Sequence, residues 1–310
     1  MQKKILIALD DSTHSRFALK YALAAAEVID DLHYVLVWAH PAISAIMVEE
    51  AKTDVKVRRE VERLSRKQRE AADNLLQQGR DTLLQGGIAA ERIDTRALAY
   101  GQGIAQDLLA YAQKQRLDAI VAGRRGISGL QSFFMGSVSN NLVQQSLEIP
   151  VWVIGGKVAP RNVLVAVDGR ENALRALDHA AFMLGPPREA RLTLLHMRPR
   201  LRDFCEIDIE AISTAAETQI VKTGRLGCVD DFFPLVQAKL GEFGFAPDQV
   251  RFETRDTLTT VAGGIVKEVK KGGYDTIVLG RRGGPSQAFT GRVSHHVLNA
   301  LADKAVWIVP

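Results

Sequence analysis

The sequence repeats itself after about 157 residues, and this internal duplication restricts the possible folds more than any other feature. Four pairs of segments carry the repeat: residues 5–10 (ILIALD) with 163–168 (VLVAVD), 33–38 (HYVLVW) with 191–196 (RLTLLH), 118–126 (DAIVAGRRG) with 275–283 (DTIVLGRRG), and 151–154 (VWVI) with 306–309 (VWIV). A period of this length is that of a whole domain, not of a solenoid unit. The sequence therefore predicts two copies of one domain, residues 1–156 and 160–310, joined by a short connector.

Each half alternates short apolar runs with helical patterns. The runs are apolar at consecutive positions, which is typical of parallel strands covered by helices on both faces. This alternation predicts an α/β fold, with two tandem doubly wound parallel sheets of five strands each and right-handed crossovers. Helices are expected at 15–29, 57–84, 104–115 and 138–145 in the first half, at 172–184 and 259–271 in the second, and more weakly within 206–243.

Composition and charge exclude several classes of protein. The chain has 310 residues, 46% of them hydrophobic, which is enough for a core in each half. The 40 basic and 36 acidic residues leave a net charge of only +4, and the charge-dense segment 50–70 mixes both signs, which favours a solvated helix over a nucleic-acid interface. The sequence shows neither a signal-peptide core nor a membrane-spanning run, so we expect a cytoplasmic protein. Cys205 and Cys228 fit no metal or redox spacing, and we interpret them as packing residues.

A glycine-rich stretch follows the fourth predicted strand of the first half. In AGRRGISGLQSFFMGS (122–137), Gly123 and Gly126 are followed after nine residues by Gly136 and Ser137, where a helix is expected to begin. Glycines allow main-chain N–H groups to approach an anion, and the first turn of a helix presents further N–H groups to it. Asp10 ends the first strand and should lie at the same edge of the sheet. The alternative is that these are tight-turn glycines with no ligand.

This spacing resembles the ATP-binding signature of the universal stress protein family. The aspartates at 10 and 168, the LLH ending at His196 and the sequence GSVS at 136–139 also match, and the resemblance covers the whole chain as two tandem domains. It implies a Rossmann-like fold of the adenine nucleotide alpha hydrolase type. Relatives with one domain dimerise through their last strands, so PVWVI (150–154) and AVWIV (305–309) are expected to pair within the chain as a pseudo-dimer, from which a homodimer could form.

The resemblance also implies a ligand, ATP together with Mg²⁺, and a set of residues in the first half that bind it. Ala8, Asp10 and Ala39 would lie against adenine and ribose; Gly123, Gly126, Gly136 and Ser137 would hold the phosphates, flanked by Val138 and Ser139. The motif assigns no role to Arg124 and Arg125. Each could contact a phosphate through its planar guanidinium or could be a solvated loop residue.

The second half departs from the signature. Its glycine loop has seven residues instead of nine, and the Gly-Ser pair is replaced by Gly291 and Arg292. We interpret this half as a degenerate copy in which Arg292 could partly replace the lost hydroxyl. A second site, if present, would use Asp168, Met197, Gly280, Gly283, Gly291 and Arg292. In the first half the family's histidine at the end of strand two is replaced by Trp38, which we interpret as a packing residue, and His40 could be a displaced equivalent.

The resemblance implies a nucleotide-dependent sensor or regulator of the stress response, acting on protein partners that the sequence does not identify. No nucleophile-elbow serine, HExxH motif, Walker lysine or GxGxxG motif is present, and the adjacent His295 and His296 point in different directions on a helix. Any ATP hydrolysis is therefore expected to be slow. Two alternatives remain open: a slow ATPase, and an interaction scaffold that binds no nucleotide.

Overall fold

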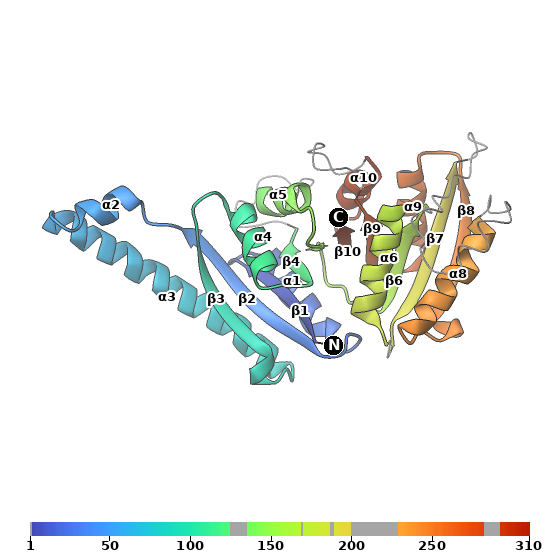
Figure 1. The fold of residues 1–310 in the computed structure, drawn as a ribbon, viewed down its shortest axis with the longest axis horizontal. Coiled ribbons are helices and arrows are strands. Elements are labelled where there is room, and N and C mark those ends of the chain that lie inside the picture. The colour runs from blue at the N-terminus through green and yellow to red at the C-terminus, as the bar shows by residue number, and fades with distance from the viewer. Residues whose placement is uncertain (1, 125–134, 169, 187–188, 200–228, 282–291) are drawn as a thin grey trace.

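The computed structural model describes residues 2–124, 135–168, 170–186, 189–199, 229–281 and 292–310. Within these residues the ten strands form one continuous sheet in the order β3-β2-β1-β4-β5-β10-β9-β6-β7-β8, so each half supplies five adjacent strands (Figure 1). All neighbouring strands run parallel except β5 and β10, which run antiparallel. The predicted α/β fold and the pairing of the two last strands are confirmed.

The first half contains five strands and five helices within the described residues. They are β1 (Lys3–Leu9), α1 (Thr13–Ala25), β2 (Leu32–Pro41), α2 (Ala45–Glu50), α3 (Val55–Gln85), β3 (Ile93–Tyr100), α4 (Ile104–Lys114), β4 (Ala119–Gly123), α5 (Ser137–Gln145) and β5 (Val151–Ile154). The second half has β6 (Asn162–Val167), α6 (Glu171–Leu184), β7 (Arg191–Pro199), α8 (Val229–Glu242), β8 (Val250–Thr257), α9 (Val261–Gly272), β9 (Thr276–Gly280), α10 (Arg292–Ala300) and β10 (Ala305–Val309). Short 3₁₀ turns at Ala90–Arg92 and Pro247–Gln249 precede β3 and β8.

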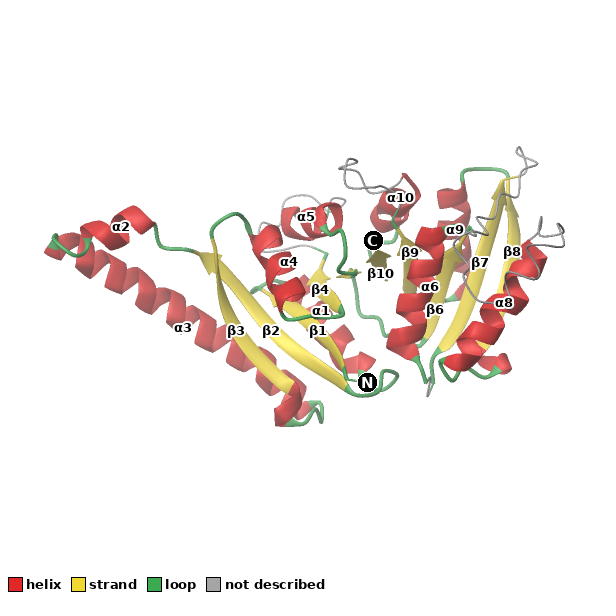
Figure 2. Ribbon diagram, viewed as in Figure 1, coloured by secondary structure: helices red, strands yellow, loops and turns green. Residues whose placement is uncertain are grey.

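Helices cover both faces of the sheet, which is why its central strands are apolar at consecutive positions (Figure 2). One face packs against α1 and α3 in the first half and against α6 and α8 in the second. The other face packs against α4 and α5, and against α9 and α10. Helix α3 is longer than the sheet it covers: its four buried residues all lie at or beyond Ala72, and its first turns extend past the sheet together with α2 (Figure 1).

The antiparallel pair β5 and β10 joins the two halves through stacked tryptophans. Trp152 lies opposite Trp307 in the ladder, and their rings are parallel within 2° with centroids 3.8 Å apart. Each indole N–H donates a hydrogen bond to a helix of the other half: Trp152 to His179 Nε2 of α6 at 3.1 Å, and Trp307 to the Tyr21 hydroxyl of α1 at 2.9 Å. His179 and Tyr21 occupy equivalent positions of the repeat. The joint is therefore reciprocal, like the interface of a two-fold dimer.

The predicted helices are present, with shifts at their ends. Helix α1 ends at Ala25 although an apolar pattern continues to Ile29, because Val28 and Ile29 are buried by a turn and not by a further helical turn. The helix begins after Ser12, whose hydroxyl accepts from the Ser15 N–H, so Ser12 is the N-cap. Helix α2 was not expected from the sequence. No helix in the described part of the chain is long and apolar enough to span a membrane.

Candidate functional site

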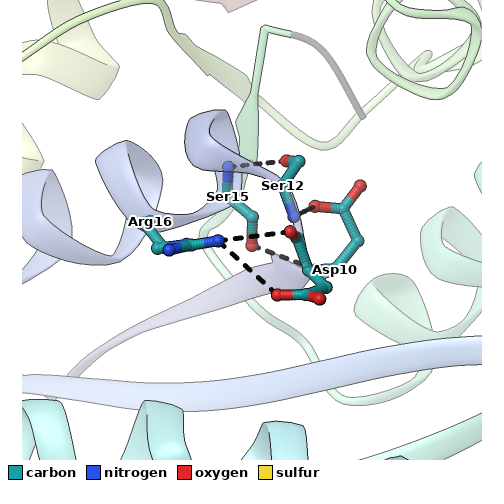
Figure 3. A network of polar contacts seen from close by, with 5 residues as sticks. Asp10, Ser12, Ser15 and Arg16 are labelled. Carbon is teal, nitrogen blue, oxygen red and sulfur yellow. Dashed lines mark hydrogen bonds and ion pairs between the residues drawn. The ribbon is translucent and has the colours of Figure 1, made fainter. Parts of the chain in front are cut away.

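Asp10 lies immediately beyond β1 and shapes the turn into α1. Its carboxylate Oδ1 accepts the Ser12 N–H at 3.0 Å, and its own main-chain N–H donates to Ser15 Oγ at 3.0 Å (Figure 3). The side chain is half-buried at the carboxyl edge of the sheet. In the second half, Asp168 accepts the Arg170 N–H at 3.2 Å in the same way. Both aspartates therefore organise a strand-to-helix turn, and this feature does not distinguish the two halves.

Gly123 ends β4 and packs directly on the first turn of α1. A Cβ at this position would overlap the main chain of His14 and would lie 2.7 Å from the Ser15 nitrogen. Gly280 has the same surroundings, because its Cβ would overlap the main chain of Asn172 and lie 2.9 Å from the Ala173 nitrogen. The first glycine of each GRRG segment is thus required by close packing between strand and helix. Its presence in both halves is explained without a ligand.

The two ends of the 124–136 segment are hydrogen-bonded to each other. The Gly136 N–H donates to the Arg124 carbonyl at 2.8 Å, and the buried Ser139 hydroxyl donates to the Gly123 carbonyl at 2.6 Å. Ser139 therefore closes the base of the loop. Its hydroxyl proton is donated to the Gly123 carbonyl and is not available to a ligand. Ser137 is the exposed first residue of α5, and the glycine at the N-cap position has no side chain to accept from the first-turn N–H groups. Val138 is half-buried beside it.

Three alanines line the carboxyl edge of the first half on the face covered by α4 and α5. Ala8 and Ala122 are neighbours in the β1–β4 ladder, and both contact the core of this face. Ala39, half-buried near the end of β2, shares the face because it lies two residues after Val37, the ladder partner of Ala8. The carboxyl edge of the first half therefore carries three small side chains at adjacent strand ends; Ala122 is 3% exposed, and Ala8 and Ala39 are half-buried.

The second half fills the same positions with larger side chains. Ala8 corresponds to Ala166, but Ala39 corresponds to Met197 and Ala122 to Leu279. Met197 and Leu279 are both buried, and Met197 packs on α9 so closely that a Cβ on Gly264 would lie 2.7 Å from its sulfur. Larger side chains thus stand at two of the three positions where the first half has alanine. Met197 is therefore part of the packed core and not an open binding position.

Arg124 points away from the carboxyl edge and into the other half. It is 1% exposed, and its guanidinium donates to the carbonyls of Leu298 and Asn299 at the end of α10. Neither expected role, a phosphate contact or a solvated loop residue, matches this position. The sequence showed no sign of it, because an arginine that crosses a domain joint and an arginine in a solvated loop look alike in the sequence.

Several predicted residues are not informative about the site. Arg125, Gly126, Gly283, Gly291 and both cysteines lie outside the described residues.

Trp38 packs against the core of the α1 and α3 face and stacks on His40, on the side opposite Ala39, which agrees with a packing role. Arg292 is exposed at the start of α10, and His295 contacts Asn299 of the same helix. The described residues contain no group of three or more metal-ligating side chains.

Comparison with known proteins assigns this chain to a protein family. The sequence model of the universal stress protein family matches residues 1–155 and again residues 160–310, which together make up almost the whole chain. The chain belongs to the universal stress protein family. It is a tandem member, because each half matches the family separately.

Individual relatives agree with this membership. Universal stress protein YxiE of Bacillus subtilis is 27% identical over 157 residues, which cover 50% of this chain and 99% of that protein. A universal stress protein structure from Archaeoglobus fulgidus covers 99% of this chain and 97% of its own, at 18% identity and a TM-score of 0.64. A structure of a functionally unknown protein from Pseudomonas aeruginosa covers 99% and 92%, at 17% identity and a TM-score of 0.56. At these identities the two structures show that the fold extends over both halves.

Proposed function

We propose that the first half binds an adenine nucleotide, ATP with Mg²⁺, and that the chain acts as a nucleotide-dependent regulator of the stress response. The observation that carries the proposal is the difference between the halves at the carboxyl edge. The first half has the small side chains of Ala39 and Ala122 where the second half has the larger, buried Met197 and Leu279, so a base can approach the strand ends more closely in the first half. A packed core does not require three small residues at adjacent strand ends, since the second half packs the same fold with only one.

The proposed pose uses three elements of the first half. The adenine lies over the alanine edge formed by β1, β2 and β4, and Asp10 faces the ribose with the carboxylate oxygen that does not form the turn. The phosphates meet the first-turn N–H groups of α5 and the Ser137 hydroxyl, where the helix dipole favours negative charge. Magnesium binds through phosphate oxygens and water and needs few protein ligands, which fits the absence of a metal-ligating cluster among the described residues.

The test is a binding measurement with its stoichiometry. Calorimetry with Mg²⁺ and ATP should give one site per chain, and nucleotide should be released when the purified protein is denatured. Ser137→Ala should weaken binding about tenfold, the lower end of the cost of one hydrogen bond to a charged group, because this helix end is exposed. The control is Ser294→Ala, because Ser294 is the equivalent of Ser139 at the base of the second loop and should not affect the affinity.

Three results would change the proposal. Two nucleotides per chain would contradict the filled second edge. Absence of both heat and released nucleotide would favour the scaffold without nucleotide. Turnover of ATP that is lost in Asp10→Ala but does not depend on a partner would favour the ATPase.

A further inference from the structure

A buried arginine of the second half reaches into the first half and holds the end of α5. Arg281, the residue after β9, is 3% exposed; its Nη1 donates to the Val143 carbonyl at 3.0 Å and to the Ser146 carbonyl. Val143 lies in the last turn of α5 and Ser146 is its C-cap. Arg124 makes the mirror-image contact with the end of α10, so the two arginines are related by the repeat.

The contact matches the chemistry of a helix C-terminus. The last carbonyls of a helix have no partner within the helix, and they carry the negative end of its dipole. A guanidinium supplies several N–H donors and a positive charge together. Burial lowers the pKa of Arg281, but an arginine keeps its charge at neutral pH. Without Arg281, the carbonyls of Val143 and Ser146 would lose the hydrogen bonds that this guanidinium donates to them in the joint.

Helix α5 connects this contact to the candidate phosphate site. It has nine residues, so the arginine and the N-terminal N–H groups are separated by about 13 Å of rigid helix. At its other end, Ser139 ties the helix to Gly123, and Ser137 is exposed. Because the helix is rigid and is held at Ser139, a shift of its last turn would tilt its first turn. The tilt would move the first-turn N–H groups and the Ser137 hydroxyl.

We propose that Arg281 is a positioning residue for the nucleotide site of the opposite half. By holding the last turn of α5, it sets where the first turn presents its N–H groups and Ser137 to the phosphates. This inference rests on the proposed nucleotide binding of the first half. It gives the second half a function for its partner although its own edge is filled: the second half braces the site of the first.

Lys3 provides a matched control in the same joint. It is 5% exposed, and its Nζ donates across the joint to the carbonyls of Met183 at 3.0 Å and Gly185 at 2.7 Å, at the end of α6. Like Arg281, it is a buried cation that caps a helix of the other half. Unlike α5, however, α6 contributes nothing to the proposed site of the first half.

The experiment compares Arg281→Met, Arg281→Lys and Lys3→Met with the wild type in the full chain. Calorimetry with Mg²⁺ and ATP should show binding at least tenfold weaker in Arg281→Met, partial recovery in Arg281→Lys, and a change of less than twofold in Lys3→Met. Urea denaturation should show that Arg281→Met and Lys3→Met both lower the unfolding midpoint. Hydrogen exchange should accelerate at the α5 amides only in the Arg281 variants.

The outcomes separate this inference from the proposed function. If the wild type binds nucleotide and Arg281→Met binds equally well, the positioning role is overturned. If Lys3→Met weakens binding as much as Arg281→Met, the effect is a general loss of stability and the inference is also overturned. Should Arg281→Met fail to fold, a loss of at least threefold in Arg281→Lys with unchanged Lys3→Met supports the role, and wild-type affinity refutes it. If the wild type binds no nucleotide, the proposed function fails, and α5 exchange alone decides whether Arg281 holds the helix.

Discussion

At the carboxyl edge of its strands the first half carries Ala39 and Ala122, where the second half carries Met197 and Leu279. At the joint, the two halves mirror each other: Trp152 faces Trp307, and Arg124 and Arg281 reach across to opposite helices. Every joint residue must fit the other half, so a change on one side is felt on both. A residue at the carboxyl edge of a strand contacts only its own half, so it can change without a matching change in the other half. The two copies are thus closely matched at much of the joint and differ at the carboxyl edge, where the ligand of the first half is proposed to bind.

The joint also contains a pair of residues that differ between the halves, and this pair gives the largest expected effect. Tyr21 and His179 accept the two indole N–H groups at equivalent positions. Burial lowers the pKa of His179 to about 3 and raises that of Tyr21 far above neutrality. Between the folded pKa and the ordinary value near 6.5, only the unfolded chain binds the histidine proton, so stability falls as the pH falls. From pH 6.5 to pH 4 the loss is about 3 kcal/mol.

Urea denaturation across this pH range measures the effect. His179→Gln keeps an acceptor for the Trp152 N–H but does not titrate, so its unfolding free energy should fall less steeply with acid by about 3 kcal/mol. Tyr21→Phe, the equivalent change in the first half, should keep the wild-type slope because tyrosine does not titrate here. Parallel slopes for wild type and His179→Gln would show that the histidine is protonated without cost.

The difference at the edge can be removed by one substitution. Ala39→Met gives the first half the side chain of the second, and it should weaken nucleotide binding about thirtyfold, or about 2 kcal/mol, because the thioether takes the space of the base. Ala99→Met adds the same side chain at an exposed position of β3 beside His40 and should leave the affinity unchanged. Calorimetry on both variants provides the measurement. Equal affinity of Ala39→Met and wild type would place the base elsewhere.

The smallest expected effect concerns the projecting part of α3, which has no counterpart among the described residues of the second half. Asp54 is its N-cap and accepts the Lys56 N–H at 2.7 Å and the Val57 N–H at 3.3 Å. Asp54→Ala should destabilise the first turns by about 1 kcal/mol. Hydrogen exchange at 55–61 should accelerate, while the urea midpoint and the nucleotide affinity stay constant because these turns bury no residue. Asp73→Ala, an exposed change of the same charge within the helix, is the control. A lower midpoint in Asp54→Ala alone would show that these turns support the fold.

The sequence predicts the fold well because the signals are local and occur twice. Consecutive apolar residues such as those of β1 and β6 identify buried parallel strands, and the repeat confirms each assignment with an independent copy. The end of α1 was misplaced because Val28 and Ile29 keep a helical spacing although a turn buries them. In that case the burial pattern and the backbone conformation differ, and the sequence reports only the first.

The candidate site is predictable only in part. Gly123 and Asp10 were singled out for a ligand, yet packing on α1 and a turn explain both, and their counterparts share these roles. The direction of Arg124 depends on how close the end of α10 lies to the end of β4. These two elements are far apart in the sequence, so no local pattern encodes their distance. The contrast of Ala39 with Met197 was readable from the aligned repeat, but its meaning required knowing that both face α4 or α9.

The antiparallel pairing of β5 with β10 has a consequence for symmetry. Two identical chains that meet at a two-fold axis must carry every substitution on both sides, so such a dimer cannot keep one site and lose the other. Its assembly also depends on protein concentration. Here a covalent connector holds the two partners together at any dilution and lets their sequences change separately. The second half can therefore lose its own site and still support the site of the first half, an asymmetry that only a fused pair can encode.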